Sequence, residues 1–334
     1  MATFSPPLPG GTVYLDKLTA KGWQSVARSV QNDAGAAFFD VTPGVRYRAT
    51  TGRGAGAART TAVEARAFEL KFAEDFDRAA ADGRSPQQFA DQWRPAVPGR
   101  TCASLSSALR NVSGGVLHLR TALDASRPEA CAYTSGDESG SAPHLLNTQV
   151  ATSRTFAFTH GYAAARIKMH RHGGAHAGFW LLPAKLEPDD LPEWHDSSFV
   201  VGDPSKGVEI DVVEYWANRP ANGNPPTIGS FLHWYASNAN GRESLGAMYA
   251  GAMDMRGPAR SWSDDFHVFS VRWSPTSYEF MVDGQVFARH TRAVSQVPQY
   301  PVLSMLSSDY ELGWLETGLF SDSAQVDWVR VWSL

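Results

Sequence analysis

The segment VEIDVVEYW, residues 208–216, places three carboxylates within six residues of an otherwise apolar stretch. β-Branched and aromatic side chains are typical of strands, and a buried strand rarely accepts carboxylates without a functional reason, because desolvating their charge is costly. Glu209 and Asp211 are two residues apart, so both face one side of a strand. Glu214 joins that side only if one extra residue at Val212-Val213 forms a β-bulge, a feature common beside active sites. The segment therefore predicts a bulged strand with three acids on one face.

Such a set of carboxylates suits the cleavage of glycosidic bonds. Retaining glycosidases hold two carboxyl groups about 5 to 5.5 Å apart. The Cα atoms of Glu209 and Glu214 are expected roughly 13 Å apart at about 3.3 Å per residue, and a concave strand whose side chains lean inward closes much of that gap. Asp211 can hydrogen-bond one glutamate and, by its like charge, keep the acid protonated near neutral pH. The alternative is a solvated edge strand, which the flanking apolar residues disfavour.

The rest of the chain after residue 67 also has strand patterning, with alternating or continuous apolar runs separated by turn residues. The segment YEFMVDGQVFARH, residues 278–290, predicts a hairpin that turns at Asp283-Gly284. Helical periodicity is weak, and one short helix is expected around Pro86 to Trp93. The fold class predicted is all-β, an antiparallel β-sandwich of the jelly-roll kind.

The first part of the chain predicts a separate small module. Short strand-like segments recur about every ten residues, with turn signals between them, which favours a small immunoglobulin-like β-sandwich over residues 8–52. Residues 53–66 are rich in Gly, Ala and Thr and are interpreted as a linker. Residues 67–334 then form the catalytic domain. No candidate catalytic cluster occurs in the first module.

Composition excludes several classes of function. The net charge of −4 provides no basic field for nucleic acid, and no stretch approaches the about 20 apolar residues that span a membrane. The two cysteines, Cys102 and Cys131, fit one disulfide of an exported protein, and two unrelated buried thiols are the alternative. The first residues, MATFSPPLPGG, contain no secretory signal. We expect a secreted, extracellular monomer from which the signal has been removed and to which a Met has been added.

The sequence resembles glycoside hydrolase family 16, whose members have E-[ILV]-D-[IV]-x-E on a strand of a concanavalin-like jelly roll. EIDVVE matches the bulged form found in laminarinase-like, agarase-like and carrageenase-like members. The likeness continues, in the family's order, through about residues 67 to 334, at HGYAAARIKMH, AGFWLLP, DDFHVFSVRWSPTSYEFMVDG and VDWVRVW. Two stretches depart from the family pattern. The usual D-E-F is Glu74-Asp75-Phe76, and the usual W-P-A-x-W is replaced by GGAHAGFW.

The resemblance implies a mechanism. Glu209 would be the nucleophile, Asp211 the assisting carboxylate and Glu214 the acid/base, with no cofactor needed for catalysis. It implies endo-acting, retaining hydrolysis of a β-linked polysaccharide, with β-1,3-glucan the first choice. A galactan such as agar or carrageenan, transglycosylation by the same intermediate, and a non-catalytic glycan-binding protein on the same fold are the alternatives.

Other residues are candidates for sugar contacts or a metal ion. Flat aromatic rings pack against pyranose rings, and the tryptophans considered for such a platform are Trp180, Trp216, Trp234 and Trp314. His233, on the strand after the acids, could reach the cleft. The cluster HRHGGAH contains His170, His172 and His176, for which sugar hydrogen bonding, an exposed loop and a metal site are all considered, with His176 retained as a candidate sugar contact.

The family resemblance also implies a structural Ca²⁺ ion away from the cleft. Asp75, Asp327 and the carbonyl of Gly115 match the usual ligand positions roughly, and oxygen ligands from distant segments suit this ion.

Overall fold

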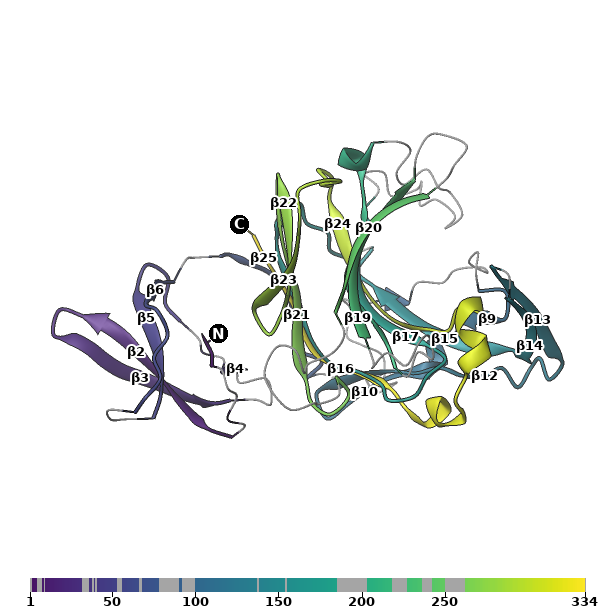
Figure 1. Ribbon diagram of the computed structural model, residues 1–334, viewed down its shortest axis with the longest axis horizontal. Helices are drawn as coiled ribbons and strands as arrows, with labels where there is room; N and C mark the ends of the chain where they lie inside the picture. Colours follow the sequence, from purple (N-terminus) through teal and green to yellow (C-terminus); the bar gives the residue numbers. More distant parts are fainter. Residues whose placement is uncertain are drawn as a thin grey trace.

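Two sheets, antiparallel except for the pairing of β9 with β15, stack face to face and make up most of the computed structural model (Figure 1). The structure describes residues 2–4, 8, 10–31, 36–37, 39, 41–52, 56–65, 68–77, 90–91, 100–136, 138–153, 155–184, 203–217, 227–235, 242–249 and 262–333. Among these residues, no helix is long and apolar enough to cross a membrane. The jelly-roll fold class predicted from the strand patterning is confirmed.

The first sheet has the strand order β10-β11-β25-β16-β21-β22-β23, with β7 paired to β25. Its strands are β7 (Leu70–Glu74), β10 (Arg110–Ser113), β11 (Val116–Leu119), β16 (Gly161–Lys168), β21 (His267–Ser274), β22 (Ser277–Val282), β23 (Gln285–His290) and β25 (Ala324–Trp332).

The second sheet carries the acid segment and has the order β12-β15-β24-β17-β18-β19-β20, with β8 and β9 paired to β15. Its strands are β8 (Ala90–Asp91), β9 (Ala103–Leu105), β12 (Ala122–Leu123), β15 (Leu145–Ala151), β17 (His176–Pro183), β18 (Glu209–Trp216), β19 (Thr227–Tyr235), β20 (Arg242–Tyr249) and β24 (Gln299–Leu306). A separate pair is formed by β13 (Ala130–Ser135) and β14 (Glu138–Pro143).

The main core lies between the two sheets. Phe179 and Tyr215 of the second sheet are fully buried in one apolar cluster with Phe269 and Val329 of the first. Side chains alternate along a strand, so one face of β18 packs into this core while its other face carries the acids. Burying each large apolar side chain fully contributes about 1.5–3 kcal/mol to the free energy of folding, relative to leaving it exposed.

The hairpin between β22 and β23 forms as predicted. Val282 pairs with Gln285, so Asp283 and Gly284 are the two turn residues, with φ of 47° and 73°. Positive φ at both positions is the geometry that a two-residue type I′ turn needs. The Asp283 carboxylate also accepts a hydrogen bond from the Val268 backbone N–H at 2.9 Å, which anchors the turn to β21.

The short helix expected around Pro86 to Trp93 is wrong where the structure describes it. Ala90 and Asp91 form strand β8 and pair antiparallel with β15. The backbone groups at the edge of β15 offer these residues a hydrogen-bonding partner that local helical periodicity could not reveal. The remaining residues of that expected helix lie outside the described residues.

The described helices are short 3-10 helices: η1 (Ser107–Leu109), η3 (Pro204–Lys206), η5 (Asp309–Trp314) and η6 (Thr317–Ser321). The predicted disulfide between Cys102 and Cys131 is confirmed. It packs with Leu145 and with Leu312 of η5 in a second apolar cluster. The disulfide region therefore supports η5, which reaches the acid strand.

The N-terminal residues form their own sheet, in the order β3-β2-β5-β6. It consists of β2 (Thr12–Thr19), β3 (Gly22–Val30), β5 (Arg46–Thr51) and β6 (Val63–Glu64), beside a pair of short strands, β1 (Ala2–Thr3) and β4 (Ala36–Ala37). Its core is a small separate cluster of Ala2, Val13, Ala37 and Ala49. The immunoglobulin-like class and the boundaries 8–52, 53–66 and 67–334 stay predictions.

Candidate active site

The acid segment is a bulged central strand of the second sheet, as predicted. On one side Phe179 pairs with Val213 and Trp180 with Asp211, so Val212 is the extra residue. On the other side the register shifts between Asp211 and Glu214. The Ser230 hydroxyl donates a 2.7 Å hydrogen bond to the Val212 carbonyl, which satisfies a backbone group that the bulge removes from the ladder. The bulge brings Glu214 to the face that Glu209 and Asp211 share.

Cross-strand pairing defines what surrounds the acids on that face. On β17, Trp180 lies opposite Asp211 and Gly178 lies opposite Glu214. On β19, His233 lies opposite Glu209. A Cβ added at Gly178 would come within 3.2 Å of the Ser304 hydroxyl and 3.3 Å of the Trp180 ring, so a larger residue there would crowd these two side chains.

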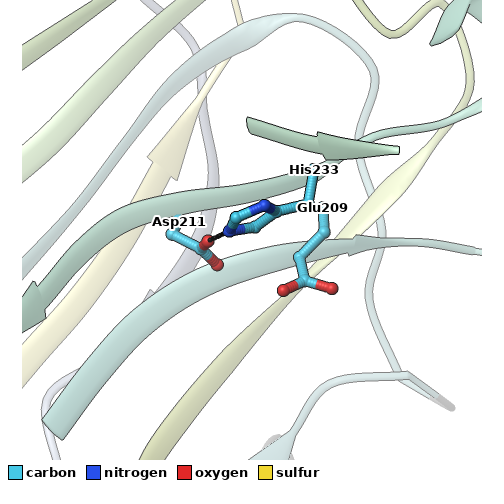
Figure 2. A group of neighbouring side chains, drawn as sticks. All are labelled: Glu209, Asp211 and His233. Atoms are coloured by element: carbon cyan, nitrogen blue, oxygen red, sulfur yellow. Dashed lines mark ion pairs between the residues drawn. The ribbon is translucent and has the colours of Figure 1, made fainter. Parts of the chain in front are cut away.

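Glu209, Asp211 and His233 lie together at one end of this face (Figure 2). His233 Nε2 is 3.1 Å from Asp211 Oδ2, and Asp211 is 3% exposed. One ligand atom from each of the three residues lies within 4.8 Å of the others, so this group could hold a metal ion by spacing alone. The His233 ring beside Asp211 compensates the buried carboxylate charge when the imidazole is protonated. We therefore interpret the group as part of an acid–base site.

Glu214 has the electrostatics of a general acid. Burial raises its pKa, and the negative charge of Asp211 raises it further, to about 7, against the opposing effects of His176 and His233. A carboxyl group with this pKa is protonated over the weakly acidic range and can exchange its proton near neutrality. The like-charge effect of Asp211 is the one that the sequence spacing predicts.

A fourth carboxylate, from a distant segment of the chain, lies close to the site. His176 Nε2 is 3.8 Å from Glu214 Oε1, and Nδ1 of the same ring is 3.0 Å from both carboxylate oxygens of Glu311. Glu311 lies on η5 and is fully buried. The Tyr310 ring stacks on His176 with 6.2 Å between ring centroids. Neither Glu311 nor Tyr310 is predicted as a site residue from the sequence pattern.

The candidate aromatic residues differ in position. Trp180 is 6% exposed, and its indole N–H donates to the Ser304 hydroxyl at 3.0 Å. Trp216 is as deeply buried and meets Phe231 edge to face. Trp234 follows His233 on β19, so it faces the opposite side of that strand. Trp314 ends η5. Their contacts with sugar stay predictions.

The cluster HRHGGAH is not a shared site for its three histidines. His170 is fully buried, with Nε2 3.1 Å from the Ala175 carbonyl. His172 is half exposed and pairs with Glu316 at 3.1 Å. His176 Nε2 lies 3.8 Å from the Glu214 carboxylate, whereas the His170 ring meets Tyr215 of the same strand edge to face. Among the described residues, the group of His, Cys, Asp and Glu with metal-ligand spacing is Glu209, Asp211 and His233, not these histidines.

The residues expected to bind calcium do not favour that ion in this arrangement. Asp75 pairs with Arg330 at 2.6 Å, and Asp327 pairs with Arg166 at 2.6 Å. A guanidinium group beside each carboxylate neutralises the charge that would attract the cation. The structural calcium stays an untested prediction, and no step below depends on it. Gly115 lies in the turn between β10 and β11.

A jelly roll with three acids on one face of a bulged strand has the architecture of a carbohydrate-active β-sandwich protein. Residues 141–329, more than half of the chain, match the glycosyl hydrolases family 16, and the chain belongs to that family.

Relatives in this family include both enzymes and binding proteins. The chain is 28% identical over 137 residues to a glucan endo-1,3-beta-glucosidase of Cryptopygus antarcticus, covering 41% of each chain. It is 28% identical over 146 residues to the beta-1,3-glucan-binding protein 2 of Manduca sexta, covering 43% of this chain and 25% of that protein. The chain thus spans less than half the length of these relatives. The endo-beta-1,3-glucanase of Pyrococcus furiosus shares the fold, with a TM-score of 0.57 and 20% identity over 80% of this chain and 94% of that one.

Proposed function

We propose that this protein is a retaining endo-β-glycanase that hydrolyses a polysaccharide, with β-1,3-glucan as its substrate. The observation that supports this most is Glu214, an acid on the same strand face as Glu209 and Asp211, whose pKa is raised to about 7 by burial and by Asp211. A binding protein has no need of a carboxyl group poised to exchange its proton near neutrality.

The proposed reaction is a double displacement. A Glu209 oxygen attacks the anomeric carbon while the bond from that carbon to the leaving oxygen breaks, and Glu214 gives its proton to the leaving oxygen. The product is a glycosyl ester on Glu209. Glu214, now ionised, takes a proton from water, whose oxygen attacks the same carbon and releases Glu209. In the free protein the negative charges of Asp211 and Glu209 both raise the pKa of Glu214. Once Glu209 is esterified, its charge is lost and the repulsion on the Glu214 carboxylate decreases.

The choice of β-1,3-glucan rests on the relatives, two of which are named for that polymer. Agar and carrageenan remain alternatives within the family. Release of reducing sugar from a panel of soluble polysaccharides, with analysis of product length, tests the choice. We expect short oligosaccharides from β-1,3-glucan and none from the galactans. The reverse pattern would overturn the proposed substrate but not the proposed mechanism.

A non-catalytic glycan-binding protein is the second candidate, because one relative is named as a binding protein. Glu209→Gln and Glu214→Gln separate the two functions. For an enzyme, each change lowers turnover by roughly 10² to 10⁴-fold, or more for the nucleophile, while thermal unfolding is retained. Binding without any sugar release from the unchanged protein would support the binding function instead.

A further inference from the structure

His176 and Glu311 form a buried charge pair behind Glu214. Both oxygens of Glu311 are 3.0 Å from His176 Nδ1, and one of them also accepts the Ser308 backbone N–H at 2.7 Å. Glu311 has no exposed surface and His176 is 3% exposed. An ionised carboxylate in such a place is stable only beside a positive partner or several donors.

The His176 ring is oriented with one nitrogen toward Glu311 and the other toward Glu214, the proposed acid/base residue. Because Nδ1 of His176 faces a carboxylate, that nitrogen carries a proton, and in the protonated ring Nε2 carries one as well. Nε2 is the atom that lies 3.8 Å from Glu214 Oε1. Tyr310 stacks on one side of the ring, and Trp216 lies 6.0 Å away at a tilt. The imidazole is therefore held between two carboxylates in a fixed orientation.

We propose that Glu311 is a positioning residue that keeps His176 an imidazolium, so that an N–H points at Glu214 and stabilises its carboxylate once it has given up its proton. This inference rests on the acid/base role proposed above for Glu214. The imidazolium keeps both of its protons throughout, and no proton leaves the Glu311–His176 pair. Its effect is to stabilise the ionised state of Glu214 between the two displacement steps.

The charges around the pair agree with this role. Burial lowers the pKa of His176, but the charge and hydrogen bonding of Glu311 outweigh this effect, so the pKa of His176 is raised. The charge of Glu214 raises this pKa further, and the charge of Arg100 lowers it. His170 is the other histidine that interacts electrostatically with His176. The further charged groups facing Glu214 are Asp211, Glu209 and His233. His233 lowers the pKa of Glu214, as His176 does, whereas Asp211 and Glu209 raise it.

One member of the pair, His176, lies where the sequence departs from the family pattern. His176 belongs to GGAHAGFW, the stretch that replaces the usual W-P-A-x-W. Glu311 also has a local structural role, because it is the third residue of a capping box that begins at Ser308 and opens η5. Glutamine serves equally well in a capping box, so Glu311→Gln removes the charge and keeps the local structure.

The test is the ionisation of Glu214 itself, followed by carbon-13 NMR of labelled glutamate carboxyl groups, with Glu214→Gln to assign the signal. In Glu311→Gln and in His176→Asn we expect the pKa of Glu214 to rise from about 7 by roughly 1 unit, because a nearby opposite charge is lost. The double variant should titrate like His176→Asn alone, since Glu311 acts through the imidazole.

Glu316→Gln is the matched control. Glu316 makes the same type of contact with His172 at 3.1 Å, but both side chains are about 40% exposed. This variant should leave the Glu214 titration unchanged. Thermal unfolding of every variant checks that the fold is kept, and Glu311→Gln suffices for the test if His176→Asn does not fold.

An unchanged Glu214 pKa in folded Glu311→Gln would overturn the proposal, and so would a shift that persists when His176 is already replaced. The titration does not depend on turnover. If the Glu214 pKa shifts in a protein that cleaves no polysaccharide, the role of Glu311 in setting the charge of His176 is supported, and the proposed enzymatic function is overturned. In an active protein, the alkaline limb of kcat/KM should move upward with the NMR value.

Discussion

The negative charge of Asp211 raises the pKa of Glu214. Asp211 is 3% exposed, it lies on the strand between Glu209 and Glu214, and its charge adds to burial in raising that pKa. A general acid must hold its proton before the bond breaks, so the rate should fall as pH rises through about 7. The direction follows from the sign of the shift: the protonated form is favoured below that pKa and is lost above it.

Asp211→Asn should therefore move the alkaline limb of kcat/KM to lower pH by about 1 unit, because one of the causes that raise the pKa of Glu214 is removed. Burial remains, so the pKa stays above the ordinary value of a glutamate. The measurement is kcat/KM against pH from 4 to 9 with a soluble β-1,3-glucan. Asp16→Asn, in the N-terminal sheet, is the control that should leave the limb in place. A limb that moves upward in Asp211→Asn would contradict the assignment.

Residues of the site differ in how far the sequence could reveal them. The three acids and the bulge follow from spacing, because charges at Glu209, Asp211 and Glu214 are costly in an apolar strand unless they share one face. Glu311 gives no such signal. Its sequence context, three residues after Ser308, indicates a capping box, and only the tertiary fold brings it to His176, 135 positions earlier. Long-range pairings of this kind have no local pattern.

At the scale of elements, the bulge in β18 depends on its neighbour β19. Ser230 is fully buried and donates to the Val212 carbonyl, the backbone group that the extra residue leaves outside the regular ladder. Ser230→Ala leaves the Val212 carbonyl without this donor, which lowers the free energy of unfolding by about 1–3 kcal/mol. We expect a lower Tm together with a kcat reduced about tenfold, because Glu214 follows the bulge by two residues and loses its fixed position.

Ser270→Ala provides the comparison. Ser270 is also fully buried, and its hydroxyl accepts a hydrogen bond from Tyr162 at 2.8 Å, but it lies on β21 in the other sheet. This change should lower the Tm by a similar amount and leave kcat unchanged at temperatures where both variants are folded. Equal kcat values for the two variants would show that the bulge holds Glu214 without the serine.

The strand also predicts a stereochemical outcome for the proposed reaction. Both glutamates lie on one face of β18, which favours nucleophilic attack by one of them over placement of a water between carboxylate and sugar. Proton NMR during the first minutes of cleavage of a β-linked substrate should therefore show the β-anomer as the first product. An α-anomer formed first would indicate inversion and exclude the double displacement, even if both glutamates proved essential.

Elements with a strong local signal were predicted, and those defined by remote pairing were not. The hairpin at Asp283-Gly284 combines alternating strands with a turn dipeptide that accepts positive φ. The expected helix around Pro86 to Trp93 had only a weak pattern, and its described residues Ala90 and Asp91 pair with β15, about 60 residues away in the sequence. Propensity in such a short segment is easily overridden by an available strand edge.

At the scale of the whole molecule, the two large sheets and the N-terminal sheet have separate cores within the described residues. Ala2, Val13, Ala37 and Ala49 form a cluster of their own, and the residues of the main cluster begin at Phe72. Strand β7 pairs with β25 from Leu70 onward, so residues of the first large sheet begin at Leu70. The described N-terminal strands pair with one another and contribute no acid to the face of β18.

A chain that begins at Ala65 should therefore fold and cleave soluble β-1,3-glucan with a kcat/KM within about threefold of the full chain, because β7 and both large sheets are kept. Thermal unfolding and reducing-sugar release from the two chains, measured side by side, check this. Glu209→Gln in the shortened chain measures the background rate. A shortened chain that unfolds at the same temperature but has lost activity toward short soluble oligosaccharides would show that the N-terminal residues complete the site. Loss of activity only toward insoluble polysaccharide would leave the prediction intact and indicate that the module serves to bind the polymer.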